Sequence, residues 1–233
     1  LQLFETFNVR FGVVLTGPTM GGKTRCYEVL QNAMTSLREE GHDDEKFQVV
    51  HTSVINPKCI SMGELYGEFN ELTQEWTDGL ASTLIRAAVA DETEDKKWTV
   101  FDGPIDALWI ENMNSVMDDN RTLTLPNGER IRLLPHACMI VETFDLQYAS
   151  PATISRCGVV WVDPKDLGCR PFFVRWVKDR CLLTERNEEM AIFLELYDRY
   201  IPKLMAFVLE GIVDGEIVRK RLGQVVGMPD IQL

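Results

Sequence analysis

One stretch of eight residues constrains the fold of this 233-residue chain more than any other. Gly17-Pro-Thr-Met-Gly-Gly-Lys-Thr24 fits the pattern G-x-x-x-x-G-K-[ST], in which the backbone of a glycine-rich loop cradles phosphate groups. An apolar run of β type, Phe11–Thr16, precedes it. Apolar residues at helical spacing follow it: Cys26, Leu30, Ala33 and Leu37. The pattern predicts a strand, a phosphate-binding loop and a helix in succession; the alternative is an ordinary glycine turn before a helix.

A second motif lies further along the chain. Trp98-Thr-Val-Phe-Asp102 is an apolar strand that ends in an acid, the Walker B pattern. We expect the carboxylate of Asp102 to lie beside Thr24 and to help hold Mg²⁺; the alternative is a surface aspartate that caps a loop. Thr24 and Asp102 are the predicted Mg²⁺ ligands. The predicted contacts to ATP or ADP are Gly17, Pro18, Thr19, Met20, Gly21, Gly22, Lys23, Thr24 and Asp102.

The residue after Asp102 bears on catalysis. Hydrolytic P-loop ATPases of the AAA+ type carry a glutamate there, which polarises the attacking water, whereas this chain has Gly103. General base catalysis typically contributes about 10²- to 10⁴-fold, so we expect this site to hold ATP rather than to turn it over. Asp106 and Glu111 are the acids that could substitute, although we expect Asp106 to cap a helix and Glu111 to lie on its solvated face.

Five apolar, β-branched runs predict the sheet. Their apolarity is nearly continuous, which is typical of parallel strands covered by helices on both faces. The predicted strands are Gly12–Thr16, Phe47–Ser53, Trp98–Asp102, Cys138–Thr143 and Gly158–Val162. The predicted helices are Thr24–Glu40, Leu80–Ala90, Ala107–Met117 and Ser150–Arg156. The expected fold class is α/β, a P-loop domain over residues 1–165.

Two inserts and a tail complete the prediction. Leu65–Thr77 is compatible with a β-hairpin, and Thr122–Leu133 carries Asn-Gly between alternating apolar residues, a strong hairpin signal. The tail shows amphipathic helical patterns at Phe172–Leu183 and Met190–Glu210, and we expect the second helix to bend at Pro202. These patterns indicate the start of a helical unit over residues 166–233.

Composition limits the partners. The net charge of −12 argues against a general binder of nucleic acid or of acidic membranes. No apolar run approaches the length of a membrane span, and the first residues do not form a signal peptide. Six cysteines without a C-x-x-C pair suit reduced thiols in an intracellular protein, and no zinc site is expected. We expect the chain to be a piece of something longer.

Arg156 is the remaining candidate. It lies between a predicted short helix and the last predicted strand. An arginine at the rim of such a domain can act on a neighbouring subunit's nucleotide as an arginine finger. The alternative is a surface arginine or a local ion pair, and position alone leaves the two open.

Several stretches together carry a family resemblance: Gly17–Thr24, Ile55–Cys59, Met62–Phe69, Glu75–Gly79, Phe101–Asn112, Asn127–Ile131 and Ser150–Cys157. They resemble the second AAA+ module of dynein heavy chains, the axonemal (ciliary and flagellar) ones in particular. In that family six AAA+ modules form a ring, and the second binds ATP and is thought not to hydrolyse it.

The resemblance implies partners and roles. Arg156 would complete the site of the first module, the two hairpins would contact the mechanical linker, and the tail would begin the small helical lid. Partners would be the neighbouring modules, the linker and other dynein chains, with microtubules bound only through other parts of the parent motor. The location would be the cytoskeleton of a ciliary or flagellar axoneme. One departure stands out: where AAA+ proteins carry a polar sensor, often Asn, this chain offers Glu142, Thr143 and Asp145.

Three rival functions remain at this point. They are an active AAA+ ATPase, a P-loop kinase or transferase, and an interaction scaffold whose P-loop stays empty.

Overall fold

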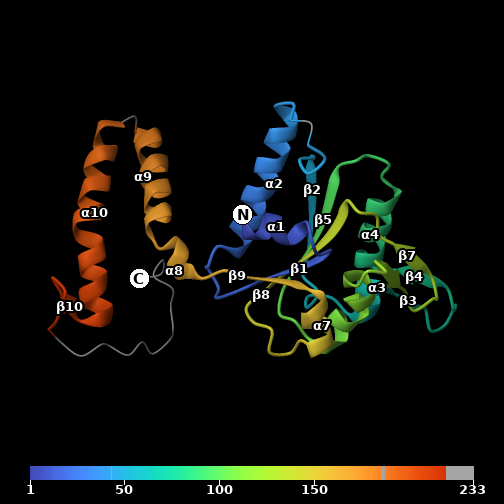
Figure 1. Ribbon diagram of the computed structural model, residues 1–233. Coiled ribbons are helices and arrows are strands. Elements are labelled where there is room, and N and C mark those ends of the chain that lie inside the picture. The colour runs from blue at the N-terminus through green and yellow to red at the C-terminus, as the bar shows by residue number, and fades with distance from the viewer. Residues whose placement is uncertain (43, 185–186, 219–233) are drawn as a thin grey trace. The chain divides into compact units, whose positions relative to one another are not determined.

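The computed structural model describes residues 1–42, 44–184 and 187–218. Within it the chain divides into two units, Leu1–Asp163 and Pro164–Leu233. Figure 1 shows that the first unit mixes strands and helices and that the second consists mainly of helices.

A single five-stranded sheet forms the centre of the first unit. Its strands are β1 (Gly12–Thr16), β2 (Val50–Ile55), β5 (Lys96–Asp102), β8 (Ala137–Thr143) and β9 (Gly158–Trp161), in the order β2-β5-β8-β1-β9. Every neighbouring pair is parallel. The five predicted strands and the α/β fold class are confirmed. The second strand begins at Val50 rather than at Phe47.

Helices cover both faces of this sheet. They are α1 (Gln2–Phe7), α2 (Lys23–Glu39), α3 (Met62–Tyr66), α4 (Leu80–Ala90), α5 (Ala107–Ile110), α6 (Asn114–Met117) and α7 (Pro151–Arg156). Successive residues of β1 point to opposite faces, so Val13 packs in one core with Tyr27 of α2, and Val14 packs in the other with Ile85 of α4. In Figure 1, α1 and α2 lie on one side of the sheet, and α3 and α4 on the other.

The prediction of one continuous helix over Ala107–Met117 is wrong. A 3₁₀ turn, Glu111–Met113, separates α5 from α6. Asparagine side chains compete with the helical backbone for hydrogen bonds, and Asn114 at the start of α6 accepts a hydrogen bond from the Thr153 hydroxyl, 2.9 Å away. The break therefore lies next to a tertiary contact that the helical pattern alone does not reveal.

Two hairpins project from the first unit. The first pairs β3 (Gly67–Phe69) with β4 (Trp76–Asp78), and the second pairs β6 (Thr122–Thr124) with β7 (Arg130–Arg132). Both were expected from the sequence. Gly67 directly follows α3 with φ of 110°, and a Cβ there would lie 2.2 Å from a ring carbon of Trp76. Only glycine fits the point where the helix turns into the hairpin.

The second unit is a pair of long helices. It contains α8 (Pro164–Leu167), α9 (Arg170–Thr184), α10 (Asn187–Glu210) and the short strands β10 (Ile212–Val213) and β11 (Glu216–Ile217). The Phe173 and Tyr197 rings stack with centroids 4.4 Å apart. α10 continues through Pro202. The end of the predicted helical unit, residues 219–233, lies outside the described residues. Within the described part of the chain, no helix has the length and apolarity needed to cross a bilayer.

Candidate nucleotide-binding site

The glycine-rich loop joins the carboxyl end of β1 to the first turn of α2, as the motif predicts. Gly17 has φ of 153°, and a Cβ there would lie 2.3 Å from the carbonyl oxygen of Val162. Gly22 caps α2 in the left-handed region, with φ of 93°. Both positions require glycine, because the first has no room for a side chain and the second has a conformation that L side chains rarely adopt.

The rest of the loop is compact at its base and open at its tip. The amide of Gly21 donates to the carbonyl of Pro18, 3.1 Å away. Gly21 is buried, whereas Thr19 and Met20 are exposed, with φ of 65° at Met20. The loop thus lies ahead of a 17-residue helix, whose N-terminal amides attract anions.

Lys23 lies within this loop. Its side chain is buried, and its Nζ donates to the carbonyl oxygens of Gly17 and Pro18, each 3.0 Å away. Carbonyl oxygens satisfy hydrogen bonds of an ammonium group without cancelling its charge. The loop therefore holds a buried positive charge at the position where the motif expects phosphate.

Thr24 makes the contact that links the loop to the rest of the sheet. Its Oγ1 donates to Glu142, whose Oε1 and Oε2 are both 2.9 Å away. Glu142 is the residue before the end of β8, a strand that is buried throughout. β8 lies between β1 and β5, so its carboxyl end reaches the loop from the neighbouring strand.

Asp102 ends β5 and is the register partner of Glu142. Asp102 is exposed, whereas Glu142 is 8% exposed. Burial is the main cause that raises the pKa of Glu142; the Thr24 hydrogen bond and the charge of Lys23 oppose it, and the charge of Asp102 adds to it. The structure thus brings Thr24, Asp102 and Glu142 together at one edge of the sheet, where the carboxyl ends of the strands meet.

Gly103 follows directly in the loop after β5. A Cβ at Gly103 would lie 3.0 Å from Oδ1 of Asn56 and 3.4 Å from Cδ of Pro57. Asp106 caps α5 by accepting from the amide of Trp109, 3.1 Å away, as predicted, and it also pairs with Lys58. Glu111 is exposed, also as predicted. Neither acid is held toward the P-loop by a contact described in the structure.

Arg156 lies at the opposite edge of the sheet, where the amino ends of the strands meet. It is the last residue of α7 and precedes β9, whose first residue pairs with Val13 near the start of β1. Its Nε donates to Oδ1 of Asp118, 2.7 Å away, and its Nη1 donates to the carbonyl of Ala152, 2.8 Å away. About a third of the side chain is exposed. The structure therefore separates Arg156 from the P-loop cluster and gives it a local ion pair.

Comparison with known proteins places these residues in an evolutionary context. No protein-family model matches the chain. Human axonemal dynein heavy chain 6 is 50% identical to it over 209 residues, which make up 89% of this chain and 5% of the human protein. The chain is homologous to part of the axonemal dynein heavy chains.

Other axonemal dyneins match the whole chain. The dynein-1-alpha heavy chain of the flagellar inner arm I1 complex of Chlamydomonas reinhardtii is 43% identical over 236 residues, 100% of this chain and 5% of the algal protein. Human axonemal dynein heavy chain 10 is 43% identical over 234 residues, with the same coverage of 100% and 5%. The chain thus spans about 5% of the length of these dyneins. The dynein homology supports an AAA+ interpretation of the α/β sheet.

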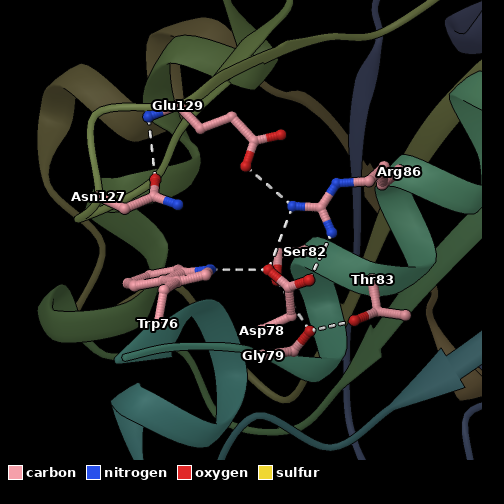
Figure 2. A network of polar contacts seen from close by, with 8 residues as sticks. All are labelled: Trp76, Asp78, Gly79, Ser82, Thr83, Arg86, Asn127 and Glu129. Atoms are coloured by element: carbon pink, nitrogen blue, oxygen red, sulfur yellow. Dashed lines mark hydrogen bonds and ion pairs between the residues drawn. The ribbon is translucent and has the colours of Figure 1, made fainter. Parts of the chain in front are cut away.

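A second polar cluster joins the two hairpins of this dynein homologue (Figure 2). Arg86 of α4 donates to both carboxylate oxygens of Asp78, at 2.7 and 3.2 Å, and to Oε2 of Glu129 at 2.9 Å. Trp76 Nε1 also donates to Asp78 at 2.8 Å. The hydrogen bonds from Arg86, then from Trp76, hold the pKa of Asp78 below its usual value. One helix side chain therefore ties together hairpins that are distant in sequence.

Sequence reasoning did not assign a role to Glu142. It noted the residue only as one of three in place of the usual sensor of AAA+ proteins. An available signal was the burial expected of its strand, because a carboxylate in a fully covered strand needs a polar partner. That partner, Thr24, is 118 positions away in the sequence, so the pairing became visible only with the strand order.

Proposed function

We propose that the chain is a nucleotide-binding AAA+ module of an axonemal dynein heavy chain, corresponding to the second module of the motor ring. It binds Mg·ATP or Mg·ADP as a structural or regulatory ligand. The observation that carries this proposal is the P-loop itself, in which the buried ammonium of Lys23 lies on two neutral carbonyls ahead of the first turn of α2.

The residues present fit this ligand. Gly17 and Gly22 keep the loop backbone bare, and Lys23 supplies the charge that phosphates require. Thr24 and Asp102 offer hydroxyl and carboxylate oxygens, the ligand type that Mg²⁺ prefers. Mg²⁺, when bound, neutralises phosphate charge. Thr24 would hold the cation directly and Asp102 through water.

We propose further that this module does not hydrolyse ATP appreciably. Gly103 has no side chain to act as a general base, and the nearby Asp106 is engaged by the α5 amide and by Lys58. A missing base removes about 10²- to 10⁴-fold in rate. ATP would then stay bound for long periods and act on the module's conformation.

The remaining proposals concern partners. Arg156, at the sheet edge away from its own P-loop, would act as an arginine finger on the neighbouring AAA+ module. The hairpins tied by Arg86 would contact the motor linker. Other dynein chains would be further partners, and microtubules would be bound only by other parts of the heavy chain. The location would be the cytoskeleton of a ciliary or flagellar axoneme.

The test of the proposed function is nucleotide binding that depends on Lys23. At an ATP concentration of about 100 times Kd, binding stabilises the folded chain by about 2.7 kcal/mol. We expect Mg·ATP to raise the melting temperature of the wild-type chain and to have almost no effect on Lys23→Ala, because a compact cation aimed at phosphates is lost. Differential scanning fluorimetry measures the shift.

The matched control is Lys97→Ala, a lysine of β5 that is also buried and that contacts Thr93 and Asp91 instead of the loop. It should retain the ATP-induced shift. Equal shifts in the wild type and in Lys23→Ala would overturn the assigned site and favour the scaffold with an empty P-loop.

A further inference from the structure

Glu142 holds the one hydroxyl that the P-loop motif assigns to Mg²⁺. Both carboxylate oxygens of Glu142 lie 2.9 Å from Oγ1 of Thr24. A hydroxyl has one proton to donate and two lone pairs with which to accept. Because Glu142 takes the proton, the lone pairs of Thr24 are directed elsewhere and stay available to a cation.

The surroundings of Glu142 suit this role better than a purely structural one. Glu142 is 8% exposed, yet it lies beside the exposed Asp102 and Thr24 at the edge of the sheet. Two neighbouring carboxylates repel one another, and the nearby charge of Lys23 offsets part of this repulsion. A further cation bound beside Asp102 and Thr24 would offset more of it, so the position is favourable for a cation site.

We propose that Glu142 is a positioning residue of the Mg²⁺ site, which orients the Thr24 hydroxyl and strengthens it as a Mg²⁺ ligand. A hydrogen bond to a carboxylate is about twice as strong as one to a neutral acceptor, and such outer partners raise the basicity of the ligand that they hold. This inference rests on the proposed nucleotide-binding function, because the cation arrives with the phosphates. Among the described residues, no three His, Cys, Asp or Glu side chains form a metal site by themselves.

The direct test is Glu142→Gln with and without Mg²⁺. Glutamine keeps the shape and one acceptor oxygen but removes the charge. We expect the ATP affinity of the variant to fall about tenfold in millimolar Mg²⁺ and to match the wild type in EDTA. Isothermal titration calorimetry of ATP into the chain measures both affinities. An equal loss in both buffers, or no loss in either, would overturn the proposal.

A double-mutant cycle shows whether Glu142 acts through Thr24. Thr24→Val removes the hydroxyl with little change of shape. In that background Glu142→Gln should have almost no further effect on Mg·ATP affinity, because residues that act as a unit are not additive. An undiminished tenfold loss would show that Glu142 acts without Thr24 and would contradict the proposal.

Two controls separate this outcome from failure of the fold or of the proposed function. Glu39→Gln makes the same charge change on the exposed last turn of α2 and should leave both affinities unchanged. Thr24→Ser keeps the hydroxyl and should retain most of the Mg²⁺ dependence. If the wild-type chain binds no ATP in either buffer, the proposed function is wrong. If the wild type binds ATP and Glu142→Gln leaves both affinities unchanged, only the proposed role of Glu142 is wrong.

Discussion

The two edges of the central sheet carry different chemistry. At the carboxyl edge, Thr24, Asp102 and Glu142 come together from α2 and two adjacent strands. At the amino edge, Arg156 pairs with Asp118. A parallel sheet places all its strand ends of one kind at one edge. One domain can therefore bind a ligand at one edge and present a separate group at the other, which is the arrangement that the proposed trans role of Arg156 needs.

The largest expected effect is that of replacing Arg156, at the amino edge of the sheet. In the intact parent motor, Arg156→Ala should lower microtubule-stimulated ATPase activity on the order of 10³-fold, because a finger stabilises charge on the neighbour's phosphates in the transition state. Arg156→Lys should not rescue, since a point charge lacks the planar fork of arginine. The ATP affinity of this chain should stay unchanged by either substitution.

Asp118→Asn distinguishes the finger from a structural ion pair. This variant removes the negative charge that pairs with Arg156, 2.7 Å away, but keeps an acceptor oxygen and the arginine. If the pair matters only for the fold, Asp118→Asn and Arg156→Ala will lower the melting temperature alike and leave motor turnover intact. That pattern would contradict the trans role.

An intermediate effect concerns the carboxyl edge. The unmodified chain loaded with ATP should release phosphate little faster than Lys23→Ala. Gly103→Glu should gain less than about 10²-fold, the low end of base catalysis, because Asn56 already lies 3.0 Å from the position of the new Cβ. Gly103→Glu combined with Asn56→Ala should gain more than either alone. Brisk turnover by the unmodified chain that Glu111→Gln abolishes would instead establish the active ATPase.

The smallest effect lies away from both edges, in the hairpin cluster. Arg86→Ala should reduce the free energy of unfolding by at most about 1 kcal/mol, because Arg86 and Asp78 are well exposed and salt screens their attraction. The pKa of Asp78 in the folded chain is lowered from 3.8. The stability that the Asp78 carboxylate contributes is therefore present above pH 3.8. It is lost as the pH falls through the lower pKa that Asp78 has in the folded chain.

Urea unfolding at several pH values measures this contribution. On acidification below pH 3.8, the wild type should lose more stability than Asp78→Asn, which has no proton to gain at this position. Identical pH profiles would show that the Arg86 bridge contributes nothing measurable to the fold.

Local patterns made most of the fold predictable. The five strands, the N-cap role of Asp106 and the Asn-Gly hairpin depend on residues close together in the sequence, so a single chain reveals them. The break at Glu111–Met113 was missed; it directly precedes Asn114, which contacts the distant Thr153, and that contact is not visible in the local pattern. The roles predicted for Lys23, Thr24, Asp102 and Arg156 as nucleotide, metal and finger residues stay predictions.

Long-range pairs account for the part of the site that the sequence did not reveal. Thr24 and Glu142 lie on different elements 118 positions apart, and Arg86 and Glu129 lie 43 positions apart. No spacing rule connects such residues, because their meeting depends on strand order and on how the hairpins fold over α4. A motif scan therefore finds the loop and leaves out the partner that orients its threonine.

Gly17 also bears on how relatives of this chain should be interpreted. A side chain at this position would run into the backbone of Val162 whether or not a ligand is bound. Natural selection for the fold alone would preserve this glycine, even in a descendant that had given up its ligand. The presence of the first glycine of the motif is thus a poor indicator that a relative still binds nucleotide. A substitution at Lys23 is the change that would indicate loss of binding.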